Sequence, residues 1–251
     1  MAQISPGRPP RPPAGDDGGS PLSAADVAAR LGQAQARIAQ ACARAGRDPS
    51  GVRLLPVTKT HAADVVRWTV AAGYRRCGEN RVQELVAKAA ALPDVPVEWA
   101  VIGHVQTNKA ALAARWAVEV QSVESVKLAA ALQRRCEALD RRLDILIEVN
   151  TSGEASKFGL RPDEAEAFTA ALRPFDRLRP RGLMTLALPS TDPARVAPCF
   201  ETLVGVRDRL RQRDGGGWDE LSMGMSGDFE WAIERGSTCV RLGTVLFGPR
   251  G

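Results

Sequence analysis

The chain has 251 residues, of which 44% are hydrophobic and 25% are charged, a composition typical of a globular protein with one large domain. Its 34 basic and 29 acidic residues give a net charge of +5 and do not gather into a basic block, so nucleic-acid binding is not expected. Five dispersed cysteines and only two histidines argue against a Cys/His metal cluster and favour a reducing compartment. The chain shows neither a secretory signal nor an apolar run of about 18 residues, and we therefore expect a cytoplasmic protein without a membrane span.

Residues 1–21 are rich in proline and glycine and are expected to be a disordered tail. Folding is expected to begin near Ser23, a candidate N-cap before a long helix that ends around Gly46. Short apolar runs and helical stretches alternate after it. The strands are predicted at residues 52–58, 74–77, 98–102, 117–121, 143–150, 181–186, 220–223 and 239–242. The helices are predicted at residues 62–72, 81–91, 107–115, 123–139, 162–172, 193–213 and 228–235, with Pro162 in a first turn.

This alternation of strands and helices indicates a parallel sheet, because each right-handed crossover returns the chain in the same direction. Closing eight such units gives a (β/α)8 TIM barrel of the α/β class over residues 22–251, preceded here by one extra N-terminal helix. A doubly wound open sheet is the alternative, and hydrophobic periodicity does not distinguish the two.

Polar and reactive residues follow the predicted strands. Lys59 ends the first strand, Asn80 follows the second and His104 follows the third. Later strand ends carry Asn150, Met184, Ser222, Ser226 and Arg241. In a barrel all of these ends face one rim, where binding and catalytic groups collect. Turn chemistry explains any one of them about equally well, and Asn80 is also a candidate N-cap, so the prediction of a site depends on the set.

Lys59 stands at the end of the apolar segment 54–58. A lysine in this position is partly desolvated, which lowers the pKa of its amine and makes the neutral form available to a carbonyl group. The alternative is a lysine that extends to solvent.

The loops after the seventh and eighth strands have the composition of a phosphate site. Ser226 supplies a hydroxyl between glycines, and Gly243 and Thr244 can present backbone amides beside it. Barrels often bind phosphate with these two loops. A pair of tight turns without a ligand is the alternative. The polar loop 150–159 is placed at the rim of the same site.

From about Leu22 to its end, the chain resembles the YggS/PROSC family of pyridoxal phosphate homeostasis proteins. The motifs that carry the resemblance are Val57-Thr58-Lys59-Thr60, Gly78-Glu79-Asn80, Val82-Gln83-Glu84, His104-Val105-Gln106-Thr107-Asn108-Lys109, Ser156-Lys157-Phe158-Gly159, Arg181-Gly182-Leu183-Met184, Leu221-Ser222-Met223-Gly224-Met225-Ser226, Val240-Arg241-Leu242-Gly243 and Phe247-Gly248. The sequence departs from the family pattern at His61, Cys77, Arg81 and residues 227–229, which concern the surroundings of the cofactor.

The resemblance implies a barrel like the N-terminal domain of alanine racemase, with pyridoxal 5′-phosphate (PLP) held as a Schiff base on Lys59. Ser226 and the amides of Gly243 and Thr244 would hold the phosphate, and Arg241 would face the pyridine nitrogen. The cofactor-binding residues implied in this way are Lys59, Asn80, Met184, Ser222, Ser226, Arg241, Gly243 and Thr244.

A bound cofactor does not by itself predict an enzyme. PLP enzymes draw electrons into a protonated pyridine ring, and Arg241, which is permanently charged, disfavours that protonated form. Because the chain ends at Gly251, we also expect no added domain to supply a second base. We therefore expect a protein of PLP homeostasis and delivery with little or no turnover.

A PLP-dependent amino-acid racemase or lyase of low activity is the alternative function. A phosphate-sugar-binding barrel without pyridoxal is a third. The expected partners are the small-molecule cofactor and PLP-dependent apoenzymes as candidate recipients, with no nucleic acid and no membrane, and we expect a monomer.

Overall fold

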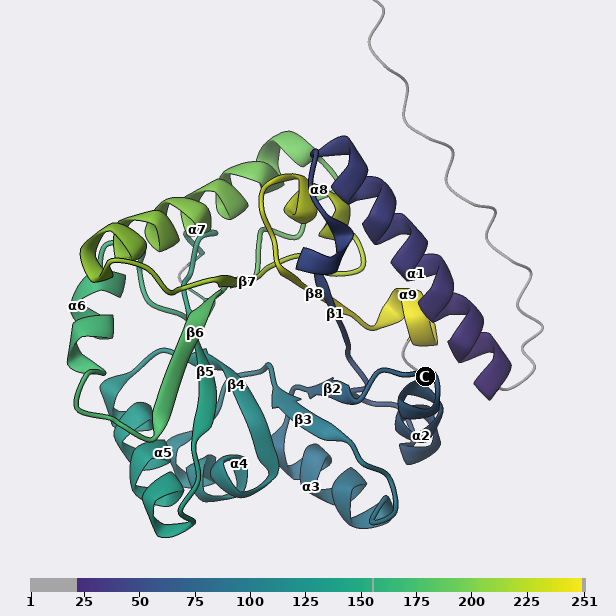
Figure 1. Ribbon diagram of the computed structural model, residues 1–251, viewed down its shortest axis with the longest axis horizontal. Coiled ribbons are helices and arrows are strands. Elements are labelled where there is room, and N and C mark those ends of the chain that lie inside the picture. Colours follow the sequence, from purple (N-terminus) through teal and green to yellow (C-terminus); the bar gives the residue numbers. More distant parts are fainter. Residues whose placement is uncertain (1–21, 155, 250–251) are drawn as a thin grey trace, which may run out of the picture.

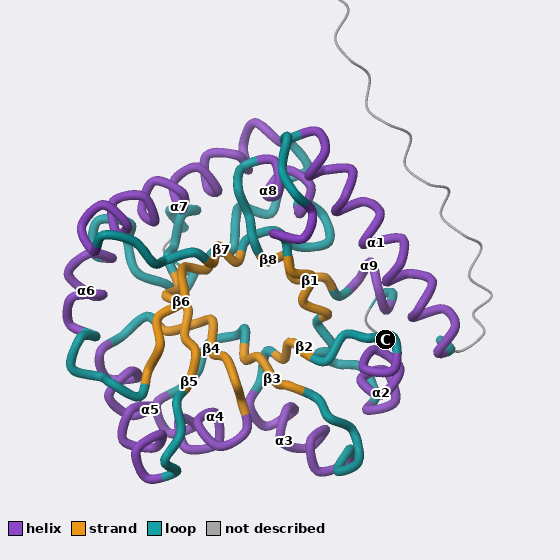
Figure 2. Tube along the Cα trace, viewed as in Figure 1, coloured by secondary structure: helices purple, strands orange, loops and turns teal. Residues whose placement is uncertain are grey.

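The computed structural model describes residues 22–154 and 156–249, in which eight parallel strands surround a central axis and helices cover their outside (Figure 1; Figure 2). The strands are β1 (Arg53–Pro56), β2 (Arg76–Glu79), β3 (Glu98–Val101), β4 (Ala117–Val123), β5 (Leu143–Glu148), β6 (Leu178–Met184), β7 (Glu220–Ser222) and β8 (Cys239–Leu242). The predicted tail, residues 1–21, lies outside the described residues.

The strands pair in the order β1-β8-β7-β6-β5-β4-β3-β2, and every pair is parallel. The barrel closes between β1 and β2 through a parallel bridge of Val57 with Gly78, beside which the Thr58 amide donates to the Gly78 carbonyl at 3.1 Å. Leu55, Ala100 and Cys239, from three strands, pack together with little solvent exposure. The prediction of a (β/α)8 barrel is confirmed over the open-sheet alternative.

The helices lie between and outside the strands. They are α1 (Ala24–Arg44), α2 (Ala63–Ala71), α3 (Val82–Ala91), α4 (Ala110–Trp116), α5 (Val126–Ala138), α6 (Ala165–Ala171), α7 (Pro193–Asp214), α8 (Phe229–Glu234) and α9 (Thr244–Phe247), with short 3-10 turns at Pro49–Gly51 and Thr107–Lys109. Among the described residues no helix is long and apolar enough to cross a membrane.

The extra N-terminal helix, α1, begins as predicted at Ser23. Ser23 Oγ accepts from the Asp26 amide at 3.2 Å, and the Asp26 carboxylate accepts from the Ser23 amide at 3.0 Å, which together form a capping box. One face of α1, with Val27, Leu31 and Ile38, is buried in a cluster with residues of α8 and α9. Figure 1 shows α1 along the outside of the barrel beside these two helices.

The amino-terminal end of the barrel is closed by ion pairs. Glu119, at 1% side-chain exposure, lies 3.0 Å from Arg53 and 2.9 Å from Arg76. Arg53 also pairs with Glu220, and Arg76 pairs with Glu98 at 2.8 Å. These charges lie at or near the first residues of their strands, at the end of the barrel opposite the strand ends that carry the predicted site residues.

Several predicted boundaries are wrong. β2 is shifted to Arg76–Glu79 because Glu79 continues the strand with its carboxylate bonded inside the protein. β4 runs on to Val123, so α5 begins only at Val126. β6 starts at Leu178 and contains Pro180, which lies next to a register shift opposite β5, where a strand tolerates proline.

Two cap predictions are also wrong. Arg81, not Asn80, occupies the N-cap position of α3, and its side chain makes no cap hydrogen bond. Pro162 lies in a turn that precedes α6 rather than in its first helical turn. The short helix α9 was not predicted, because four residues are too few to show a periodic pattern.

Candidate functional site

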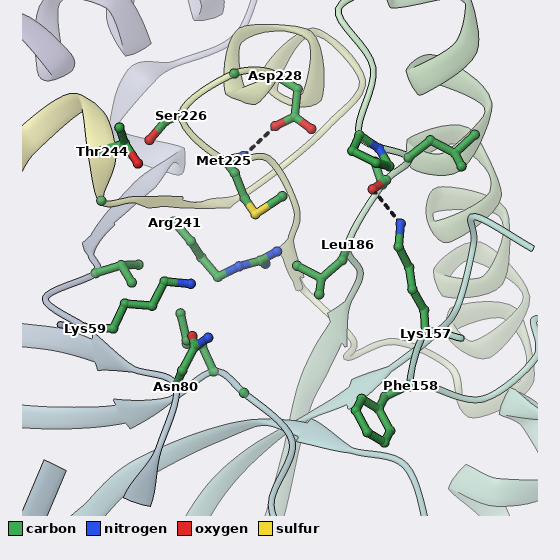
Figure 3. A pocket seen from close by; sticks show the side chains of 18 of the residues that line it. Lys59, Asn80, Lys157, Phe158, Leu186, Met225, Ser226, Asp228, Arg241 and Thr244 are labelled. Atoms are coloured by element: carbon green, nitrogen blue, oxygen red, sulfur yellow. Dashed lines mark hydrogen bonds between the residues drawn. The ribbon is translucent and has the colours of Figure 1, made fainter. Parts of the chain in front are cut away.

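A cavity of about 650 Å³ opens at the carboxyl-terminal ends of the strands, within the size range of small-molecule sites. Figure 3 shows its side chains converging from several loops. The residues that line the cavity and carry a polar or aromatic group include Lys59, His61, Asn80, His104, Glu148, Lys157, Phe158, Ser190, Ser226, Asp228, Arg241 and Thr244.

Most of the predicted site residues meet at this cavity. Those that line it are Lys59, Asn80, Ser226, Arg241, Gly243 and Thr244. Met184 and Ser222 are not among the lining residues, and both are fully buried at the ends of β6 and β7. Ser222 lies against Arg241: its hydroxyl accepts from Arg241 Nη1 at 2.6 Å and donates to Gln121 Oε1 at 2.7 Å.

Lys59 occupies the turn directly after β1 and is half-buried. Its side chain extends into the cavity, where Arg241 and Asn80 also point (Figure 3). The next residue, Thr60, has a φ of 66°, in the left-handed region that residues other than glycine seldom adopt. The sharp turn thus directs the lysine away from the strand and into the cavity.

Arg241, on β8, is a buried cation at the edge of the cavity with 3% exposure. Its Nη1 donates to the Ser222 carbonyl at 2.7 Å, and its Nη2 donates to the Thr185 carbonyl at 2.8 Å. Burial lowers the pKa of its guanidinium. Within the part of the chain that the structure describes, it forms no ion pair with a carboxylate, so its positive charge is available to a ligand.

The loops after β7 and β8 lie side by side at one end of the cavity. Ser226 Oγ accepts from the Val245 amide in the first turn of α9 at 3.3 Å, and Figure 3 shows Ser226 next to Thr244. Gly243 stands where a Cβ would come within 3.1 Å of the Val57 carbonyl oxygen. Glycine therefore allows the β8 loop to pass close to β1 and to turn its backbone toward the cavity.

Glu148 is a lining residue that the sequence reasoning missed. It ends β5 with 5% exposure, and its Oε2 has no hydrogen-bond partner. Burial, together with the charge of Glu124, raises its pKa to about 7, and Arg241 opposes the shift. The only signal was a single acidic residue within the apolar run Leu146 to Val149.

The polar loop after β5 forms the rim of the cavity. Lys157 reaches across to the Ala187 carbonyl at 3.0 Å (Figure 3). Phe158 stacks on His104, with ring centroids 4.0 Å apart and planes inclined by 12°. His104 Nδ1 in turn lies 2.7 Å from Glu124 Oε1. The loops after β3, β5 and β6 are thus connected around the mouth.

The family model of the alanine racemase N-terminal domain matches residues 30–251. A "Pyridoxal phosphate homeostasis protein" of Pseudomonas aeruginosa is 42% identical over 224 residues, which are 89% of this chain and 96% of that protein. A protein of the same name from Aquifex aeolicus is 39% identical over 221 residues, 88% of this chain and 97% of that protein.

Solved structures agree with these relatives. PipY of Synechococcus elongatus, with PLP bound, is 34% identical and superposes with a TM-score of 0.77, covering 88% of this chain and all, 100%, of that one. Alanine racemase of Clostridium difficile, at 11% identity and a TM-score of 0.70, covers 90% of this chain and 56% of the racemase, and shares the fold. The chain therefore belongs to the family of pyridoxal phosphate homeostasis proteins, built on the barrel of the alanine racemase N-terminal domain.

Proposed function

We propose that this chain binds PLP in the cavity as a Schiff base on Lys59 and acts in intracellular PLP homeostasis and delivery, with little or no turnover. One observation carries the proposal: an amine, a buried guanidinium and a hydroxyl beside a turn of backbone amides converge on one cavity from β1, β8 and the β7 loop. The PLP-bound structure of PipY supports the same cofactor.

The residues present fit the chemical groups of PLP. Ser226, with the backbone of Gly243 and Thr244, would hold the phosphate, and the positive charge of Arg241 suits an electron-rich ring nitrogen. Lys59 Nζ would attack the aldehyde carbon, forming a carbon–nitrogen double bond while the carbonyl oxygen leaves as water. Asn80 would line the ring, Ser222 would act through Arg241, and Met184 would support the ring pocket from beneath its lining residues.

The contacts of Arg241 support low turnover. When bound, PLP supplies an electron sink whose strength depends on a protonated ring nitrogen. Arg241 stays protonated and has no acceptor atom for the N–H of a protonated ring nitrogen, and in the described part of the chain it shares no ion pair with a carboxylate. Its buried bonds to Ser222 and Thr185 hold it in place as a fixed positive charge, which opposes ring protonation.

Glu148 is the observation that favours the alternative, a racemase or lyase of low activity. It is a buried carboxyl in the wall of the cavity with a pKa of about 7, the range suited to an acid or base at neutral pH. The two functions are separated by incubating the loaded protein with L-amino acids in deuterated water. Exchange of the α-proton well beyond one equivalent would establish the enzyme.

Borohydride reduction followed by mass spectrometry of the Lys59 peptide tests the cofactor linkage. We expect a reduced pyridoxyl adduct on Lys59 and none in Lys59→Ala, whose fold stays intact because the amine lies on the rim. A visible absorbance band that survives Lys59→Ala, or an adduct on another lysine, would overturn the assignment.

We further propose that the protein works as a cytoplasmic monomer that passes its cofactor to apoenzymes. Sedimentation of the loaded chain, alone and with a PLP-dependent apoenzyme, tests this. A stable dimer of the chain alone would contradict the monomer.

A further inference from the structure

The turn that carries Lys59 rests on a buried group of charged side chains that the proposed function does not use. Lys88 Nζ, on α3, lies 2.7 Å from the Thr58 carbonyl oxygen. The same nitrogen lies 2.7 Å from Glu79 Oε1 and 2.8 Å from Glu84 Oε1. An ammonium group has three N–H donors, so each acceptor receives one. The residues joined in this way are called the Lys88 cluster: Thr58, Thr60, Glu79, Glu84 and Lys88.

Both chain neighbours of Lys59 belong to this cluster. On one side, Thr58 Oγ1 donates to Glu79 Oε1 at 2.6 Å. On the other side, the Thr60 amide donates to Glu84 Oε1 at 2.5 Å. The left-handed φ of Thr60 is a strained conformation that persists where the surroundings enforce it. The backbone of Lys59 is therefore held before and after the reactive residue.

The burial of the cluster makes its geometry difficult to change. The side chains of Lys88 and Glu79 are 8% and 0% exposed, and removing one member of a buried ion pair leaves an uncompensated charge. Burial raises the pKa of Glu79, against the hydrogen bonds from Lys88 and Thr58. For Glu84, burial acts in the same direction, but hydrogen bonds from Lys88 and the Thr60 amide prevail and lower its pKa. Apolar packing commonly stabilises a core as well or better, so stability alone gives no reason for a charged cluster at this place.

We propose that Lys88 is a positioning residue for Lys59: through the Lys88 cluster it holds the turn so that Lys59 Nζ meets an aldehyde entering the cavity. This inference rests on the proposed function, because the group that Lys88 positions is the Schiff-base nitrogen. Bond formation joins Nζ to the aldehyde carbon and releases the carbonyl oxygen as water, with no oxidant or reductant. A misplacement of about 1 Å lowers the rate of such a step by on the order of 100-fold.

The test measures covalent and non-covalent binding separately. Two quantities are measured in both Lys88→Met and the parent. The first is the rate at which the Schiff-base absorbance appears after mixing with PLP. The second is the affinity for pyridoxine 5′-phosphate. That analogue carries an alcohol instead of the aldehyde and cannot form the imine. We expect Lys88→Met to slow imine formation by about 10- to 100-fold while the affinity for the alcohol analogue stays at the parental value.

Gln133→Met is the matched control. Gln133 lies on α5 at 5% exposure, against 7% for Lys88. Its side-chain hydrogen bonds go to Glu137, Asp176 and the Arg177 amide, and none of these residues lines the cavity. Gln133→Met is expected to change the stability of the protein, but neither the rate of imine formation nor the affinity for the alcohol analogue. Imine formation at the parental rate in Lys88→Met would overturn the proposal. Equal losses for PLP and the alcohol analogue would overturn it too, as would an equal slowing in Gln133→Met.

A second pair of variants keeps the test decisive if Lys88→Met does not fold. Glu84 is 25% exposed, so its substitution is milder. Glu84→Gln retains an oxygen for the Thr60 amide and should form the imine at close to the parental rate, whereas Glu84→Leu should be slow. Identical rates in the two variants would contradict the positional role. Failure of the proposed function is distinguishable, since the parent itself would then show no absorbance change and no trapped Lys59 peptide.

Discussion

Replacing Glu148 by glutamine should stabilise the cofactor-free protein at pH 8 and have much less effect at pH 5. Glu148 is 5% exposed, and one of its carboxylate oxygens has no hydrogen-bond partner. Burial, with the charge of Glu124, raises its pKa from 4.5 to about 7 against the opposing effect of Arg241. Glutamine has nearly the same shape, keeps one acceptor oxygen and carries no charge at either pH.

The magnitude follows from the shift in pKa. A change from 4.5 to about 7 corresponds to about 3 kcal/mol, at about 1.36 kcal/mol per unit. Because the folded state binds this proton more tightly than the unfolded state, stability is lost as the pH rises from 4.5 to 7, and the loss stays constant above 7. The pH-dependent difference between Glu148→Gln and the parent should therefore be about 3 kcal/mol at pH 8 and below about 1 kcal/mol at pH 5.

Urea unfolding of the apo protein, followed by circular dichroism at both pH values, measures this difference. The control is Glu164→Gln, which removes a carboxylate with 46% side-chain exposure and should follow the parent at both pH values. If the unfolding free energies of Glu148→Gln and the parent run parallel between pH 5 and pH 8, then Glu148 titrates normally and the account of its burial is wrong.

Three other substitutions test the phosphate site, the packing of β6 against β7 and the cap of α1. Ser226→Ala should weaken PLP retention by about 1.5–3 kcal/mol, one hydrogen bond to a charged group; equilibrium dialysis measures this, and unchanged retention would refute the phosphate assignment. Gly182→Ala should destabilise the barrel by about 3 kcal/mol or more, because the new Cβ would lie 1.8 Å from the Glu220 carbonyl oxygen; a thermal melt equal to that of the parent would show that β6 and β7 are farther apart than described. Ser23→Ala should cost about 1 kcal/mol by removing the cap of α1; urea unfolding measures this, and an unchanged free energy of unfolding would contradict the role of the cap.

The fold was predictable because its signal is local. Each short apolar run is followed by a helical stretch, and the alternation alone implies parallel strands with right-handed crossovers. The boundaries that failed depend on contacts that are distant in sequence. Glu79 continues β2 because Lys88 and Thr58 donate hydrogen bonds to its buried carboxylate, whereas composition alone predicts that a strand ends at such a residue.

The candidate site was predictable where position alone identifies it. Lys59, Ser226 and Gly243 stand at strand ends, and the barrel brings strand ends together. Glu148 was missed because a carboxyl within an apolar strand is identified by its surroundings, here Glu124 and Arg241. Ser222 was placed near the cofactor by resemblance, and the structure adds its contact with Arg241.

The Lys88 cluster could not be predicted from the sequence either, because most of its contacts join residues that are distant along the chain. Its glutamates belong to motifs that were recognised in the sequence, but the lysine that joins them was not singled out. Lys88 lies four residues after Glu84, nine after Glu79 and thirty after Thr58, and only the first of these separations is a helical neighbour relation. The remaining pairings exist only once β1, β2 and α3 have packed.

The closing bridge between Val57 and Gly78 lies just below the turn that bears Lys59. A ligand attached to Lys59 and packed on Asn80 would contact the residues that follow β1 and the residues that follow β2, and would so connect the two strands. Loading would then raise the cost of local separation of β1 from β2 along with overall stability. Release of the cofactor would then be coupled to the local separation of β1 from β2.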